Sequence, residues 1–244
     1  MGALTYETFN SMLLLRLGNR TELQSVGGTD FYGVWTNQAY RQLCTAKKIP
    51  ETSGRVYFPE LHTKTDTDLV ATAGTAYLSV PSDALYIESI VCTYSGYERA
   101  LDWCPPERYR TYQDRALTAS RGVPREWTRI GSRLYIYQTP DAAYTYEAWY
   151  CLNPPSLGAG QSTLIGSEWD QPILLLAAYK ASSWMGDVER AKAAKGEYLE
   201  AVQGLLGIYG NEEKDRNEHL RRTTHTSGVL GETPVRRSPA GTRS

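Results

Sequence analysis

The chain has 244 residues, of which 41% are hydrophobic and 22% charged, with a formal net charge of −1 and a mean hydropathy of −0.46. This length allows a sizeable hydrophobic core in either one domain or two. No apolar run approaches the roughly 20 residues that a membrane-spanning helix needs, and the nearly balanced charge argues against tight nucleic-acid binding.

Two helices are predicted at the start of the chain. The first covers Tyr6–Leu17, where apolar side chains recur every three or four residues until Gly18 and Asn19 end the pattern. The second begins after Thr29 or Asp30, either of which can cap it, and continues through Lys48.

The segment from Gly54 to Leu157 has the alternation and turns typical of β structure. A short helix opened by prolines is predicted within it, over Pro105–Arg115. The predicted strands are Arg55–Phe58, Leu69–Thr72, Tyr77–Val80, Tyr86–Tyr94, Tyr97–Asp102, Glu126–Ile130, Arg133–Gln138 and Tyr144–Leu152. Pro154 and Pro155 end the sheet, because proline cannot donate a ladder hydrogen bond.

The longest helical pattern is Trp169–Tyr209. Gly186 can end one helix and Asp187 can cap the next, so the segment is either two helices or one strongly kinked helix. Taken alone it is an ordinary core hairpin.

The order of elements predicts an α+β fold with separate helical and β cores. The helices of residues 1–52 and 161–210 form one bundle, and residues 53–160 form an antiparallel β domain inserted between them. Residues 211–244 form an extended arm.

The arm differs from the rest in composition. It holds seven of the 26 Lys and Arg residues but few large apolar ones, and such a segment does not fold by itself. We expect a partner chain to hold it. The candidate contact residues are Arg221, Arg222, Val229, Leu230, Val235, Arg236, Arg237 and Arg243.

Patterns for catalysis or metal binding are weak. The four cysteines are far apart and predict free thiols in a reducing compartment. His62 lies in a polar loop, and Asp66 and Asp68 favour solubility over cation binding. Glu88 and Glu147 are isolated in apolar strands and are expected to face solvent. We therefore predict no enzyme activity, no cofactor and no metal site.

The 18 tyrosines and six tryptophans are unusual and suit contact surfaces as well as cores. The aromatic strands offer a sugar-binding surface as one alternative. Their simpler interpretation is that one face, with Tyr144, Tyr146 and Ala148, lies in the core, while Tyr135 and Tyr137 share a face of their own strand.

The order and spacing of several motifs resemble the head–tail adaptor (connector) proteins of tailed bacteriophages. The resemblance covers roughly residues 4–207. Its motifs are Arg16-Leu17-Gly18, Trp35-x-Asn37-x-Ala39-Tyr40-Arg41-x-Leu43, Tyr77 to Leu85 with Pro81 and Asp83, Gly122-x-Pro124 before Trp127, Gly131-x-x-Leu134 to Tyr137 and Pro140-Asp141, Tyr150-x-x-x-Pro154, and Gly186-Asp187.

This resemblance implies a structural virion protein in the neck between capsid and tail, made in the host cytoplasm. It implies a ring of 12 copies that joins the portal protein to a downstream tail or neck protein and encloses a channel for double-stranded DNA. The C-terminal arm would reach the portal, and the DNA contact would be passive. A stopper or short-tail tube protein is the nearest alternative, and a carbohydrate- or receptor-binding module is a third.

Overall fold

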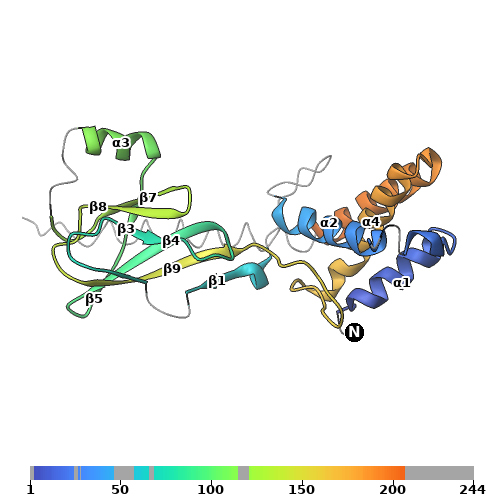
Figure 1. The fold of residues 1–244 in the computed structure, drawn as a ribbon, viewed down its shortest axis with the longest axis horizontal. Helices are drawn as coiled ribbons and strands as arrows, with labels where there is room; N and C mark the ends of the chain where they lie inside the picture. Colours follow the sequence, from blue (N-terminus) through green and yellow to red (C-terminus); the bar gives the residue numbers. More distant parts are fainter. Residues whose placement is uncertain are drawn as a thin grey trace, which may run out of the picture.

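The computed structural model describes residues 3–24, 27, 29–46, 58–65, 69–114 and 121–206. Three helices, α1 (Tyr6–Arg16), α2 (Phe31–Thr45) and α4 (Asp170–Trp184), lie at one end of an elongated molecule, and the strands lie at the other (Figure 1). Residues 188–206 form a further helix, and α3 (Pro106–Asp114) lies on the strand side. The α+β class expected from the sequence is confirmed.

Local sequence signals set the ends of the first two helices. Thr5 caps α1, and Asp30 caps α2 by accepting a hydrogen bond from the Tyr32 amide. Gly18, with φ of 83°, ends α1 in the left-handed conformation that glycine favours. The helix α2 ends at Thr45 rather than continuing through Lys48, because Ala46 has extended backbone angles.

The chain from Trp169 onward forms two helices rather than one kinked helix. Gly186, with φ of 75°, and Asp187 donate backbone hydrogen bonds to Ser183 and Ser182, which together satisfy the last carbonyls of α4. The Asp187 side chain then accepts from the Arg190 amide and caps the next helix. The two roles expected for this Gly-Asp pair are confirmed.

The helices share one core. Trp169 is 1% exposed and packs edge-on against Phe58, with ring centroids 5.0 Å apart. Leu61, which directly precedes β1, and Cys151, near the end of β9, belong to the same core. Other fully buried members are Phe9, Leu13, Tyr32, Ala39, Tyr40, Leu43, Ile173, Ala181 and Val202.

The strands form two sheets. The first has the order β1-β9-β4-β5, with β2 also paired to β9, and the second has the order β3-β8-β7-β6. Their bounds are β1 His62–Lys64, β2 Leu69–Ala71, β3 Tyr77–Ser79, β4 Ala84–Tyr94, β5 Tyr97–Ala100, β6 Asp102–Trp103, β7 Glu126–Ile130, β8 Arg133–Tyr137 and β9 Tyr144–Leu152.

A second core lies between the sheets. Ile90 and Tyr146 from the first sheet meet Trp127, Leu134 and Ile136 from the second, and each is at most 3% exposed. Tyr144 and Ala148 are also buried there, so this face of β9 is core, as the simpler interpretation held.

Three expectations about the strands were wrong. Tyr97–Asp102 is not one strand, because the chain passes from the first sheet to the second at the buried Leu101. The second half, β6, pairs with β7 in parallel, so the strand region is not purely antiparallel. His62 does not lie in a loop, since it begins β1, which pairs with β9.

Helix α3 covers the outer face of the second sheet (Figure 1). Tyr112 stacks on Tyr137 with centroids 4.1 Å apart, and Tyr109 packs on Tyr135 at 5.3 Å. Glu126 on β7 accepts hydrogen bonds from Arg108 and Tyr112 of α3. The predicted strand Arg55–Phe58 lies outside the described residues except for Phe58, and Asp66 and Asp68 also lie outside them.

Candidate assembly surfaces

Helix α2 holds the chain that returns from the strands. Asn37 Oδ1 accepts a hydrogen bond of 2.6 Å from the Leu157 amide, and its Nδ2 donates to the Leu157 and Gly33 carbonyls. One turn later, the Tyr40 hydroxyl accepts from the Leu164 amide at 3.1 Å. The two polar groups on the edge of the α2 apolar stripe therefore fix where the helical half meets the segment after β9.

We expect Asn37→Ala to lower the free energy of unfolding by about 1–3 kcal/mol, because it leaves both backbone groups of the buried Leu157 without this partner. Chemical denaturation followed by circular dichroism measures the loss. Gln38→Ala, at the neighbouring exposed position of α2, is the matched control. Slow hydrogen exchange at the Leu157 amide in the Asn37→Ala variant would contradict this role.

An exposed aromatic surface lies at the C-terminal end of α4. Trp184 is 59% exposed and packs on Phe31 and Trp35 of α2 at centroid distances of 5.3 and 5.7 Å. Val188, 58% exposed, follows it at the start of the next helix. An indole fixed by two aromatic neighbours loses little rotamer entropy on binding, which suits a protein contact.

The outer face of the first sheet carries Trp149, which is 42% exposed. Its indole N–H donates to Glu147, and Lys64 of β1 donates to the same carboxylate at 2.8 Å. The hydrogen bond from Lys64 is the main reason that the pKa of Glu147 is lowered. His62 Nδ1 lies 2.5 Å from Glu88, so both glutamates that were expected to face solvent have basic neighbours on β1.

The outer face of the second sheet has its own aromatic group. Tyr77 is 41% exposed, with the Arg133 guanidinium 4.4 Å from its ring centroid and Tyr135 at 6.2 Å. The exposed rings of the described chain are therefore spread over the end of α4 and both sheets, where Tyr97 of β5 and Trp103 of β6 are also exposed. They do not gather in one sugar-binding surface.

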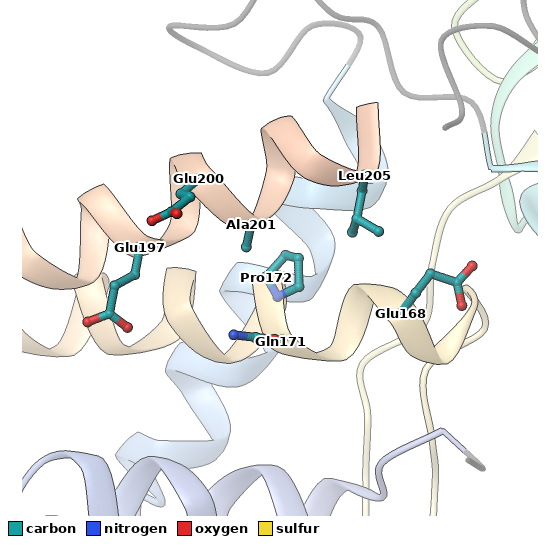
Figure 2. A pocket seen from close by; sticks show the side chains of 7 residues that line it. All are labelled: Glu168, Gln171, Pro172, Glu197, Glu200, Ala201 and Leu205. Atoms are coloured by element: carbon teal, nitrogen blue, oxygen red, sulfur yellow. The ribbon is translucent and has the colours of Figure 1, made fainter. Parts of the chain in front are cut away.

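An acidic groove of about 430 Å³ lies between the start of α4 and the 188–206 helix (Figure 2). Pro172, Ala201 and Leu205 supply its apolar surface. Its other lining residues are Glu168, Gln171, Glu197 and Glu200. Arg16 of α1 forms an ion pair with Glu197.

Reactive groups are sparse in the described part of the chain. No group of three or more His, Cys, Asp or Glu residues gathers there in a way that would hold a metal ion. All four cysteines are buried as free thiols, and burial raises the pKa of Cys44 to about 12 and that of Cys104 to about 11. None of the described helices is long and apolar enough to cross a membrane.

The predicted arm contacts, Arg221, Arg222, Val229, Leu230, Val235, Arg236, Arg237 and Arg243, all lie outside the described residues. The sequence did not predict that Asn37 and Tyr40 bind the segment after β9, and it did not predict the acidic groove. Polar side chains at the edge of an apolar helix stripe were the available signal for the first two.

Surfaces of exposed aromatic and charged side chains on an α+β body define a protein suited to contacts with other proteins. The family model described as SU10 adaptor protein matches residues 12–227 of this chain. The chain therefore belongs to the SU10 adaptor protein family, a family of phage head–tail adaptors, which are structural components of the virion. No curated protein matches the chain.

Proposed function

We propose that this adaptor forms a ring of 12 copies that joins the portal protein to a downstream tail or neck protein and encloses the channel for double-stranded DNA. The family match over residues 12–227 is the observation that carries the proposal. In this arrangement the helices of residues 1–52 and 161–210 form one bundle. Residues 53–160 form the inserted β domain, and residues 211–244 form the portal-binding arm.

The exposed surfaces support a ring. A closed ring uses head-to-tail contacts, in which each copy presents two different surfaces to its two neighbours. The Trp184 surface belongs to the helical half of the molecule, and the outer sheet face around Trp149 belongs to the strand half. The first is built from aromatic rings, and the second has the Lys64–Glu147 ion pair beside its indole. Two surfaces of different composition are suited to the head-to-tail contacts between neighbouring copies of a ring.

The charge distribution supports a channel through which DNA passes freely. Outside residues 211–244 the chain has 19 basic and 22 acidic residues. Each phosphate neutralised by a bound Lys or Arg adds affinity that passage must overcome. A body without basic excess holds DNA weakly, and the basic excess of the arm is directed to the portal.

Electron microscopy of the purified chain mixed with its portal protein tests the proposal. We expect rings that stack coaxially on one end of the portal. Rings that join a preformed neck instead of the portal would assign the chain to the stopper or tube position. Absence of both rings and co-assembly would overturn the proposal.

A further inference from the structure

The acidic groove is the surface whose chemistry most clearly defines an occupant. Its apolar part, formed by Pro172, Ala201 and Leu205, is bordered by the carboxylates of Glu168, Glu197 and Glu200 (Figure 2). None of the described residues that line it is a Lys or Arg, and Arg16 of α1 reaches only Glu197 at its border. Its volume of about 430 Å³ is within the range of pockets that bind small molecules and side chains. A segment with one apolar side chain beside two cations would match both parts.

The chain itself contains this pattern twice beyond the described residues. Leu220-Arg221-Arg222 and Val235-Arg236-Arg237 each place one apolar residue before two arginines. Residues 221–244 hold five arginines and a single acid, Glu232. Guanidinium groups pair well with carboxylates because their donors match the two oxygens.

Chain connectivity favours the first triplet. The described chain ends at residue 206, directly after the groove residue Leu205, and Leu220 is only 14 positions further on. A short tether raises the effective concentration of an attached segment to about the millimolar range, and this concentration falls as the tether lengthens. The effective concentration of Leu220-Arg221-Arg222 at the groove is therefore higher than that of Val235-Arg236-Arg237, which has a longer tether.

We propose that the acidic groove binds Leu220-Arg221-Arg222 of its own chain. The leucine packs on Pro172, Ala201 and Leu205, and the two arginines pair with the carboxylates of Glu168 and Glu200, since Glu197 already forms an ion pair with Arg16. This contact does not depend on the portal. If the arm also binds the portal, as proposed above, the groove and the portal compete for Arg221 and Arg222, and the groove retains the arm until the portal displaces it.

Disulfide formation in the full-length chain tests this contact. Ala201→Cys places a thiol on the groove surface, and Thr223→Cys places one directly after the triplet. Gln203→Cys is the matched control, because it lies on the same helix closer to the arm but does not line the groove. The four native thiols are buried and compete little under mild oxidation.

We expect the Ala201/Thr223 pair to form an intrachain disulfide about tenfold faster than the Gln203/Thr223 pair, which is the effect of two or three exposed charge pairs. Arg221→Gln with Arg222→Gln should lower the rate to that of the control pair, whereas Arg236→Gln with Arg237→Gln should leave it unchanged. High salt should also remove the difference in the chain with its native arginines.

Equal rates for the two cysteine pairs would overturn the proposal, as would a rate that responds to Arg236 and Arg237 but not to Arg221 and Arg222. A disulfide between two chains would show that the occupant comes from a neighbour and would overturn the intrachain contact. None of these results depends on portal binding, so the proposed function can fail or succeed separately.

Discussion

Trp169→Ala is expected to lower the free energy of unfolding by about 3–5 kcal/mol, the usual cost of truncating a fully buried aromatic side chain. Trp169 is 1% exposed and packs against Phe58, which comes from the other side of the strand region in sequence. The substitution leaves a cavity where the start of α4 meets the chain leading into the strands. Because whole domains are stable by only about 5–15 kcal/mol, this variant should lose much of its stability. Urea denaturation followed by far-UV circular dichroism measures the change.

Trp184→Ala is the matched control, because it removes the same side chain at a position that is 59% exposed. Its contacts with Phe31 and Trp35 are worth about 1 kcal/mol. We therefore expect little loss of stability but weaker association between copies, measured by sedimentation. Equal destabilisation by the two substitutions would contradict the placement of Trp169 in the helical core and of Trp184 on a contact surface.

Deletion of residues 210–244 should weaken binding to the portal protein about a hundredfold or more, because each copy in the ring loses a linked second contact. The thermal transition of the body should persist, since the described members of both cores end at Leu206, before the deleted residues. Cosedimentation with the portal measures binding, and circular dichroism measures folding.

Replacing Arg221, Arg222, Arg236 and Arg237 together with glutamine is the finer variant, and its portal binding should lose its salt dependence. If the chain that lacks residues 210–244 has no thermal transition, the arm is part of the folded body, and the proposal that it serves only to bind the portal is wrong. Unchanged portal binding by the glutamine variant at every salt concentration would exclude an electrostatic role for the arginines.

Much of the fold could be predicted because local signals determine it. Asp30 and Asp187 cap helices where their side chains suggested, and Gly18 and Gly186 adopt the positive φ that ends a helix. Strands such as Glu126–Ile130 and Tyr144–Leu152 have the predicted bounds, since alternation along a half-buried strand is visible in sequence.

The errors arose where tertiary contacts override local pattern. Tyr97–Asp102 reads as a single strand, but burial of Leu101 between the sheets divides it. His62–Lys64 is polar in sequence and gives no strand pattern, yet it pairs with β9 as an edge strand. Its side chains reach Glu88 and Glu147 on the outer face of the sheet.

The contact surfaces were least predictable. The groove joins Glu168 to Glu200 across two helices, and no local spacing connects residues so far apart in sequence. Asn37 belongs to one of the family motifs and to the second predicted helix, but its hydrogen-bond partner Leu157 is 120 positions away. Contacts between residues so far apart in the sequence can be identified only from the three-dimensional structure.

The most direct test of the adaptor account is electron cryo-microscopy of the neck of the intact phage particle. The account predicts a ring of 12 copies directly beneath the portal, in which density fits the helical bundle and the two sheets of residues 3–206 and arms extend from the end of the 188–206 helix to the portal. Finding the chain at another level of the tail, or in a copy number that does not form a closed ring, would contradict it.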